Sequence, residues 1–570
     1  MHIVTRKACL VLAAAALAAC GGSEDPVAPN PETASVTITP DDVALKVGES
    51  VQLTAVPHDA SGNPLTGRSI SWTTSAPGVA TVSSTGLVQA KSSGAATIRA
   101  TADGKTGEAA VSVTLPPVAS ITVSAGSADL LVGVSEQWTA QAKDAAGNVI
   151  PGIALTWSTS DPAVAIVSNA GVVLALAEGS ATISAAAEGH TGSAPLTVSA
   201  LVFTSVATGG AHTCALTTTG AAYCWGRAES GQLGVPIPST MCATDAGGVA
   251  CIRTAVPVGG GHTFASLAAG GAHTCGLTSD GTAYCWGSNA SGQLGDNTTA
   301  RRTEPVAVMT QVKFATLDLG EAHTCGLSAA GAAHCWGANT RGQLGDGTTA
   351  SRPVPGPVSG GHTFTEIAAG GFNIGHTCAL AADGSAYCWG DNENGQLGIG
   401  STDLDAHPMP AEVAGNIVFA GVTAGLGSHS CGRTAAGAAY CWGADVFGAL
   451  GNGSAGASSV PVPVSGAHAF AQIVAGGFIG HTCALKDGGA AWCWGENERG
   501  QVGDGSTVDR FEPVEVTGGR VFEVLDAGYR HTCGRSLGGV VYCWGSGATG
   551  QLGLNTIELN SQPRKVLGQP

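Results

Sequence analysis

The chain has 570 residues, which is too long for one ordinary domain and predicts several domains or a repeat array. Hydrophobic residues make up 44% of it and charged residues only 11%, a composition that excludes a largely disordered chain. The 86 glycines favour short strands joined by tight turns. The net charge of −17 excludes binding to a phosphate backbone, so no nucleic-acid partner is expected.

The N-terminal residues predict export. A basic start is followed by a short apolar run ending in "LAAC", whose cysteine is Cys20. This pattern resembles the lipobox of bacterial lipoproteins, which implies that residues 1–19 are a signal peptide and that Cys20 carries a lipid anchored in the membrane. Gly21 and Gly22 then suggest the outer membrane or cell surface. The alternative is an ordinary signal peptide cleaved nearby. The polar residues 20–34 predict a flexible tether.

Residues 35–115 and 116–199 contain one unit written twice. The first copy has "WTTSAPGVATVSSTGLVQA" from Trp72, and the second has "WSTSDPAVAIVSNAGVVLA" from Trp157, 85 residues later. Short alternating strands at this spacing predict two Ig-like β-sandwiches, with cores around these tryptophans and no cysteine in either unit. The segments "VGESVQLTA", "GLVQA" and "GAATIRATA" resemble the bacterial Ig-like domain group 2 family. That resemblance implies a spacer or adhesion module without catalytic residues.

Residues 200–570 contain one motif seven times. Four strand-like pieces per copy predict a seven-bladed β-propeller, so the whole chain is expected to be all-β. The motif resembles the regulator of chromosome condensation repeat, as in "GGAHTCALTTTGAAYCWG" and "GYRHTCGRSLGGVVYCWG", each followed by "GQLG". Gly448–Gly451 and Gly500–Gly503 depart from "GQLG" and are interpreted as turn variation. The histidine of the motif recurs at His212, His273, His323, His376, His429, His481 and His531.

Each copy carries two cysteines at a fixed spacing. In "HTCGLTSDGTAYCW", a three-residue turn places Thr278 opposite Thr282, and the same register places Cys275 opposite Cys285. In a non-hydrogen-bonded pair the Cα atoms approach to about 4.5 Å, which suits a disulfide in an exported protein. The expected disulfides are Cys214–Cys224, Cys242–Cys251, Cys275–Cys285, Cys325–Cys335, Cys378–Cys388, Cys431–Cys441, Cys483–Cys493 and Cys533–Cys543.

The alternative for this hairpin is a metal site, because His273, Cys275 and Cys285 are of the types that hold zinc. One blade would supply only three ligands, and the strict register favours the disulfide, so neither a metal nor a cofactor is expected. The histidines are then expected to be structural and to bond backbone groups at the inner end of each blade. The tryptophan of each "CWG" is expected to pack between blades.

The sequence holds no familiar catalytic motif, and no enzyme activity is expected. Asp346, Asp403 and Asp405 could contact Ca²⁺, but solvated polar turns are the favoured interpretation. Eukaryotic relatives with this repeat include a nucleotide-exchange factor for a GTPase. That activity is not transferred here, because the propeller has 16 Lys and Arg against 26 Asp and Glu and an exported chain would not meet a cytosolic GTPase.

The expected function is therefore binding of a protein or a glycan at the cell surface, in adhesion or scaffolding. One alternative is inhibition of a secreted enzyme, as in the bacterial propellers that inhibit β-lactamases. A glycan-active enzyme is the less favoured alternative.

The loops that follow "GQLG" differ most between copies, and they are the expected partner-binding region. Their candidate contact residues are Arg301, Arg302 and Phe511, the alternative being that these loops only drift in sequence. The first copy also lacks a leading proline-containing strand. We expect the C-terminal residues Ser561–Gly568 to pair beside Val202–Val206 and to complete that blade.

Overall fold

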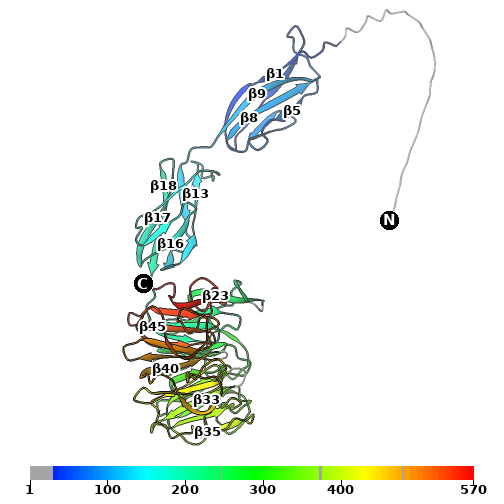
Figure 1. Ribbon diagram of the computed structural model, residues 1–570. Coiled ribbons are helices and arrows are strands. Elements are labelled where there is room, and N and C mark those ends of the chain that lie inside the picture. The colour runs from blue at the N-terminus through cyan, green and yellow to red at the C-terminus, as the bar shows by residue number, and fades with distance from the viewer. Residues whose placement is uncertain (1–29, 245–246, 372–374, 478–479) are drawn as a thin grey trace, which may run out of the picture. The chain divides into compact units, whose positions relative to one another are not determined.

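The computed structural model describes residues 30–244, 247–371, 375–477 and 480–570 (Figure 1). The expected signal peptide, the expected lipid-bearing Cys20 and most of the expected tether lie outside the described residues. The described part of the chain is almost entirely β-structure, as predicted. It contains no helix that is long and apolar enough to cross a membrane.

The first sandwich packs alternating residues of its strands into one core. In β9 (Lys105–Thr114), every second residue from Gly107 to Val113 is buried, which is the two-residue period of a half-buried strand. Ile98 and Val88 lie at the centre of this core, and Trp72 packs at its edge while staying partly exposed. The strands are β1 (Ser35–Thr39), β2 (Asp42–Lys46), β3 (Ser50–Gln52), β4 (Thr54–His58), β5 (Ser71–Thr74), β6 (Ala80–Val82), β7 (Leu87–Ala90), β8 (Gly94–Ala102) and β9 (Lys105–Thr114).

The second sandwich repeats this arrangement. Its fully buried indole is that of Trp138, whereas Trp157 is partly exposed and packs against the core as Trp72 does. The tryptophans chosen from the sequence therefore border the two cores. The strands are β10 (Ser120–Ser124), β11 (Asp129–Leu131), β12 (Ser135–Gln137), β13 (Thr139–Lys143), β14 (Thr156–Thr159), β15 (Ala165–Val167), β16 (Val172–Ala175), β17 (Gly179–Ala187) and β18 (His190–Ser199).

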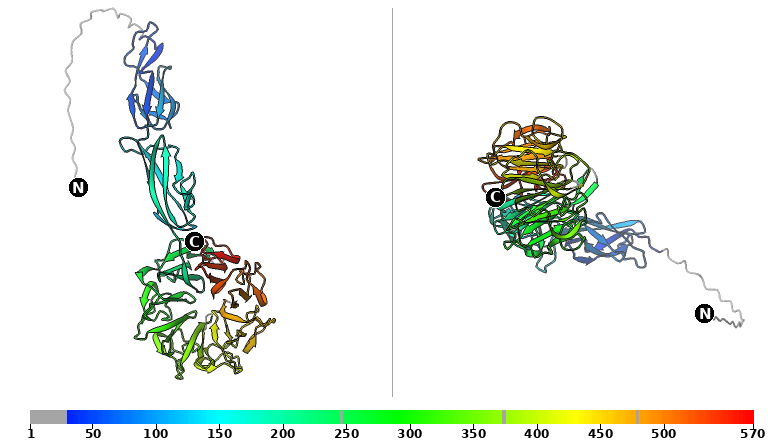
Figure 2. Two further views of the ribbon diagram at one scale, coloured as in Figure 1. Left: turned by 90° about the vertical axis from the view of Figure 1, so that its left-hand side faces the viewer. Right: turned by 90° about the horizontal axis from the view of Figure 1, so that it is seen from below.

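The rest of the described chain forms seven antiparallel sheets arranged radially, which confirms the seven-bladed propeller (Figure 2). The second strand of each blade is buried on both faces, because neighbouring blades cover it. Blade 1 has the order β19 (Phe203–Thr208), β20 (His212–Thr217), β21 (Ala222–Arg227), β23 (Gly247–Pro257), β22 (Met241–Thr244), and a short 3₁₀ segment, η1 (Gly259–Gly261), follows it.

The other six blades each contain four strands in chain order. They are β24 (Ser266–Ala269), β25 (His273–Leu277), β26 (Ala283–Gly287), β27 (Arg302–Ala307); β28 (Phe314–Leu319), β29 (His323–Ser328), β30 (Ala333–Gly337), β31 (Arg352–Pro357); β32 (Phe364–Gly370), β33 (His376–Ala381), β34 (Ala386–Gly390), β35 (His407–Glu412); β36 (Gly421–Ala424), β37 (His429–Arg433), β38 (Ala439–Gly443), β39 (Ser458–Pro463); β40 (Phe470–Gly476), β41 (His481–Lys486), β42 (Ala491–Gly495), β43 (Arg510–Glu515); and β44 (Phe522–Ala527), β45 (His531–Ser536), β46 (Val541–Gly545), β47 (Asn560–Lys565).

A disulfide joins the second and third strands of every blade. Cys275 and Cys285 are directly opposite in the register of β25 and β26, and their Cα atoms are 4.1 Å apart. The turn between them closes through the bond from the Thr278 N–H to the Thr282 carbonyl. The bonded pairs in the structure are Cys214–Cys224, Cys242–Cys251, Cys275–Cys285, Cys325–Cys335, Cys378–Cys388, Cys431–Cys441, Cys483–Cys493 and Cys533–Cys543.

The expectation that the C-terminus completes blade 1 is wrong. The C-terminal strand β47 pairs with β46 of blade 7, with Tyr542 opposite Lys565. Blade 1 needs no borrowed strand because the long insertion after its third strand supplies β23. The ring closes instead through contacts between complete blades, among them the bond from the Phe203 N–H to the Gly539 carbonyl.

The insertion in blade 1 begins at a proline for a physical reason. In blades 2 to 7, the second residue after "GQLG" or its equivalent has a positive φ and is Asn or Gly, as at Asn297 (φ 60°). Its N–H bonds to the outer strand of the next blade, as from Asn297 to the Pro353 carbonyl. Blade 1 has Pro236 there, which has no N–H and has its φ fixed near −65°. The chain therefore leaves the common path and forms the β22–β23 hairpin, bridged by Cys242–Cys251.

Candidate functional site

One hydrogen-bonded cluster joins each blade to the next. Between blades 1 and 2, the hydroxyl of Thr274 donates to the backbone carbonyl of Gln232 at 2.9 Å. The indole N–H of Trp286 donates to the same carbonyl, also at 2.9 Å. Nε2 of His212 lies 2.8 Å from the Thr274 hydroxyl. Since that hydroxyl has already donated its one hydrogen, it accepts from His212, which fixes the proton on Nε2.

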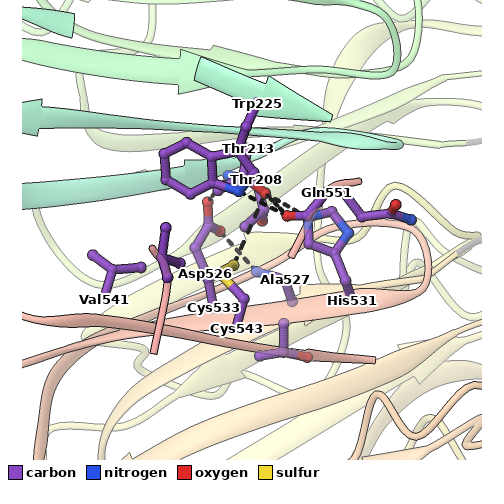
Figure 3. The surroundings of a disulfide bond; sticks show 12 residues. Thr208, Thr213, Trp225, Asp526, Ala527, His531, Cys533, Val541, Cys543 and Gln551 are labelled. Atoms are coloured by element: carbon purple, nitrogen blue, oxygen red, sulfur yellow. Dashed lines mark hydrogen bonds between the residues drawn. A yellow bond between two sulfur atoms is a disulfide. The ribbon is translucent and has the colours of Figure 1, made fainter. Parts of the chain in front are cut away.

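The same cluster recurs at all seven junctions, including the one that closes the ring. Figure 3 shows that junction, where His531 and Thr213 meet beside Gln551 and Trp225. The pairs of histidine Nε2 and hydroxyl are His212–Thr274, His273–Thr324, His323–Thr377, His376–Ser430, His429–Thr482, His481–Thr532 and His531–Thr213, at 2.8 to 3.0 Å. The histidines are structural as expected, but they bond a hydroxyl of the next blade and not the backbone.

Burial keeps these histidines neutral. Each is essentially inaccessible to solvent, and burial lowers their pKa values to about 3 or about 4. Among the described residues, no three His, Cys, Asp or Glu side chains are grouped to hold a metal ion. The blade cysteines are bonded to each other, so no thiolate remains beside the histidines for zinc.

The shared carbonyl explains why blades 5 and 6 tolerate a different "GQLG". In blade 5 the acceptor is the carbonyl of Ala449, which bonds Thr482 at 2.8 Å and Trp494 at 2.9 Å. The junction uses only the main chain at that position, so the side chain is free to change. In blade 6, the junction uses the carbonyl of Gln501, and the departure from "GQLG" falls on the following residue, Val502.

Two ends of the propeller have different chemistry. We call the end that carries residues 270–272 and 288–301 of blade 2, with their equivalents in the other blades, the loop face. The opposite end, with residues 278–282 and their equivalents, is the hairpin face. Because the four strands are antiparallel, the first and third turns of every blade lie on the loop face.

The sequence-chosen contact residues have separate roles on this propeller. Arg302 braces its own loop, with its guanidinium 2.7 Å from Asp296. Arg301 donates to the backbone carbonyl of Glu229 in the preceding blade at 2.8 Å. Phe511 lies on the outer strand β43 of blade 6 and is 37% exposed. They come from blades 2 and 6, and no contact joins the two arginines to Phe511 among the described residues.

The acidic turn residues considered for Ca²⁺ are also used inside their loops. Asp346 accepts bonds from the N–H and the hydroxyl of Thr348, at 3.0 and 2.7 Å. Asp403 accepts from His407 at 2.7 Å. These contacts, like the Asp296–Arg302 pair, hold the long loops in shape.

Sequence reasoning missed a second variable part of the loop face. The turn before each histidine is "GGAH" in blades 1 and 2, but "GEAH" in blade 3 and "GYRH" in blade 7. The residue after each "CWG" varies more widely, being Arg227, Ser288, Ala338, Asp391, Ala444, Glu496 and Ser546 in blades 1 to 7. Both positions stand inside a nearly constant motif, and their variation is visible when the seven copies are aligned column by column.

Several charged groups at these positions are buried and paired across blade junctions. Arg530 of blade 7 lies 3.3 Å from Glu496 of blade 6, whose side chain is 1% exposed. Arg341 of blade 3 lies 3.5 Å from Asp391 of blade 4, also 1% exposed. Burial raises the pKa of Glu321 to about 7, despite the nearby positive charge of Arg227. The inner part of the loop face therefore carries charged residues that differ from blade to blade, on a backbone that repeats.

The central channel of the ring is lined by the first strands of the blades and encloses about 180 Å³. Two carboxylates reach into it, Asp318 and Asp526, and each accepts an N–H from the next blade. The Thr208 N–H donates to the Asp526 carboxylate at 2.7 Å, and this bond is drawn in Figure 3. Both stay partly exposed to the channel, but desolvation of their carboxylates raises both pKa values, that of Asp318 to about 7. Their bonds make them further links between blades.

Comparison with known proteins agrees with this geometry. Two descriptions of the Regulator of chromosome condensation (RCC1) repeat match the propeller, one at residues 203–232, 264–293, 314–343, 364–396 and 470–501, the other at residues 280–327, 383–431, 436–485, 488–534 and 538–570. The chain belongs to this family. Residues 32–114 and 117–198 match the Bacterial Ig-like domain (group 2).

Similar proteins share only part of this chain. It is 29% identical over 308 residues to the E3 ubiquitin-protein ligase HERC2 of Homo sapiens, covering 53% of this chain but 5% of HERC2. It is 30% identical over 159 residues to the Ultraviolet-B receptor UVR8 of Arabidopsis thaliana, covering 27% of this chain and 36% of UVR8. The chain thus spans a minor part of these relatives. The crystal structure of human WBSCR16 matches with a TM-score of 0.52 at 20% identity, over 62% of this chain and 92% of that one, and supports the fold alone.

The junction cluster predicts a specific loss of stability. Replacing Thr274 with Val keeps the shape but leaves the His212 N–H without its acceptor and removes one donor to the Gln232 carbonyl. We expect the free energy of unfolding to fall by about 1–3 kcal/mol, measured by denaturant unfolding with tryptophan fluorescence. The matched control is Thr316→Val in β28, an exposed threonine, which should change little. Equal stability of the two variants would contradict the role of the cluster.

The buried histidines predict acid sensitivity. The pKa of His273 is about 3 in the folded chain against 6.5 unfolded, so only the unfolded chain gains its proton between those values. Its contribution is therefore fully present above pH 6.5 and is lost as the pH falls toward 3. In His273→Gln, whose amide still donates to Thr324, this loss is absent. The stability of the variant relative to wild type should rise by about 1.4 kcal/mol per pH unit on acidification through this window.

Equilibrium unfolding of both chains from pH 7 to pH 4 measures this difference. Thr316→Val serves again as the control, since it removes no titrating group and should differ from wild type by a constant amount. The comparison isolates one histidine from the carboxylates of Asp318 and Glu321, whose raised pKa values act in the opposite direction. A pH-independent difference between His273→Gln and wild type would show that this histidine titrates normally in the folded chain.

Proposed function

We propose that this chain is an exported lipoprotein whose propeller binds another protein at the cell surface, in adhesion or as a scaffold. A disulfide-bridged propeller of the RCC1 repeat family is a suitable protein-binding scaffold. The single observation that carries the proposal is the division between constant and variable parts. The contacts between blades repeat at every junction, while charged and blade-specific residues gather at the loop face.

The two Ig-like domains and the expected lipid on Cys20 fit this role. Modules of this kind would act as spacers between an anchor and a binding domain. The rigidity of the ring matters for binding, because a surface whose side chains are already held in place loses little conformational entropy when a partner binds. Such a face would serve recognition better than chemistry, and the loops supply the differences that distinguish one partner from another.

Exposed apolar side chains on the two faces allow a matched test. Leu404, Val446 and Val508 lie on the loop face and are 61–64% exposed. Met309, Val418 and Leu537 lie on the hairpin face and are 62–69% exposed. We expect changing the first three to Asp to abolish capture of a surface protein by the full mature chain, because three desolvated charges would oppose burial of that face.

The corresponding triple Asp variant of the hairpin face is the control and should capture the same protein with unchanged affinity. Both variants should unfold like wild type, since all six side chains are exposed. Capture is measured by affinity purification from cell-surface extracts followed by binding measurements on the purified protein. Failure of wild-type chain to bind any surface protein would contradict the proposal, and loss of binding only in the hairpin-face variant would reassign the face.

The anchor is tested on its own. Mass spectrometry of the N-terminal peptide from protein in isolated membranes should show a lipid on the thiol of Cys20. Cys20→Ser should move the chain from the membrane fraction to the soluble fraction, because a single lipid-bearing residue is then lost. An unmodified Cys20, or a Cys20→Ser chain that stays in the membrane, would refute lipid anchoring.

A further inference from the structure

A hollow on the loop face lies where blade 7 meets blade 1. It encloses about 280 Å³ and is lined by the turns before both histidines and by the start of the long loop of blade 7. Its charged wall is formed by Arg227 of blade 1, whose side chain is 41% exposed, and by Arg530 of blade 7, whose guanidinium pairs with Glu496. The ring of Tyr529 forms another wall, packed so closely on Gly210 that a Cβ there would lie 2.6 Å from it.

The other junctions show what this hollow lacks. At the junction of blades 3 and 4, the residue directly before "GQLG" is Arg341. It faces Asp391, the residue directly after "CWG" in blade 4. At the junction of blades 7 and 1, the same two positions hold Thr549 and Arg227. The arginine therefore belongs to the later blade of this junction, not to the earlier one. The facing position in the earlier blade holds the neutral Thr549, and no carboxylate stands there.

The neutral groups around Arg227 are already engaged. The Thr549 hydroxyl donates to the side-chain oxygen of Gln551 at 2.7 Å and lies 3.3 Å from the Ala211 carbonyl. At the junction of blades 6 and 7, Arg530 has a carboxylate, that of Glu496, but the equivalent position of blade 7 is Ser546. The positions that hold Asp391 and Glu496 at those junctions hold Arg227 and Ser546 here, so neither supplies a carboxylate.

Among the described residues, the carboxylates of Glu229 and Glu321 interact with Arg227, and neither neutralises it fully. Glu229 pairs with it on the surface, but its own side chain is 40% exposed. Such a solvent-exposed pair contributes little to stability, so a better-placed carboxylate can displace it. Glu321 interacts with Arg227 at a longer range, and burial raises its pKa to about 7, so it carries only part of a charge near neutral pH.

We propose that this hollow binds the carboxylate of an aspartate or glutamate side chain on a partner protein, with the guanidinium of Arg227 as its main contact. The planar fork of arginine suits bidentate binding of a carboxylate. The ligand group would take the position that Asp391 occupies relative to Arg341 elsewhere in the ring. The inference rests on the proposed protein-binding function and names the chemistry that one anchor of the partner would have.

The probe for the test is poly-L-glutamate, with binding to the full mature chain measured at low ionic strength. The net charge of −17 opposes any general attraction, so binding requires a local positive site. We expect Arg227→Gln to weaken binding at least tenfold. Glu229→Gln should strengthen it at least threefold, because it removes the competing carboxylate, and a misfolded protein would not show such a gain.

A matched pair of substitutions uses the repeat. Ala548→Asp places a carboxylate in the wall of the hollow and should reduce poly-L-glutamate binding at least tenfold. Ala290→Asp adds the same charge at the equivalent exposed position of blade 2 and should leave binding unchanged. Both variants carry the same net charge, so their difference reports on position.

Three outcomes would overturn the inference. They are absence of poly-L-glutamate binding to wild type, binding that Arg227→Gln does not weaken, and binding of polygalacturonate through Arg227 in place of poly-L-glutamate, which would assign the hollow to an acidic glycan. Capture of a surface protein that is unaffected by Arg227→Gln would reject this inference and leave the proposed function standing. Poly-L-glutamate binding through Arg227 without capture of any protein would support this inference and contradict the proposed function.

Discussion

One buried backbone carbonyl lies at the centre of every junction between blades. It accepts from a threonine hydroxyl and a tryptophan indole of the next blade, and that hydroxyl in turn accepts from the histidine of the first blade. All of these groups are buried, where an unmet hydrogen bond costs far more than a surface contact gains. The motif "HTC", the "CW" pair and the residue after the first glycine of "GQLG" are therefore parts of one arrangement, although they stand far apart in the sequence.

This arrangement separates stability from recognition. Because the junctions and the cross-strand disulfides keep the ring rigid, the positions beside them are free to differ from blade to blade. The residue after "CWG" is the clearest case, since it is Arg227 in one blade and Asp391 in another on the same backbone. The loop face thus combines a fixed framework with varied side chains, and that combination supports the proposal of a binding protein more than any single residue does.

The sequence allowed the fold and the cysteine register to be predicted because both depend on local periodicity. A hairpin with Gly281 in its turn has one register, and Cys275 must then face Cys285. Ring closure was predicted wrongly because the fourth strand of blade 1 is β23, hidden within an insertion that no repeat spacing revealed. The role of Arg302 could not be seen either, because its ion pair with Asp296 depends on how the loop folds back. The role of the turn "GYRH" could not be predicted because Tyr529 packs on Gly210, which lies at the other end of the propeller sequence.

In every blade, the histidine and the shared carbonyl bond to the following blade, and the hydroxyl and the indole bond to the preceding blade. All blades therefore present equivalent edges to their neighbours. Such a head-to-tail contact would allow a blade to be duplicated, lost or exchanged within a gene without inventing a new interface. Only the first and last blades must then pair without being adjacent in the sequence, and the bond between His531 and Thr213 shows that they use the same groups as every other pair of blades. Among proteins with such a ring, we expect the residues of the loop surface to vary more readily than the residues of the junctions between blades.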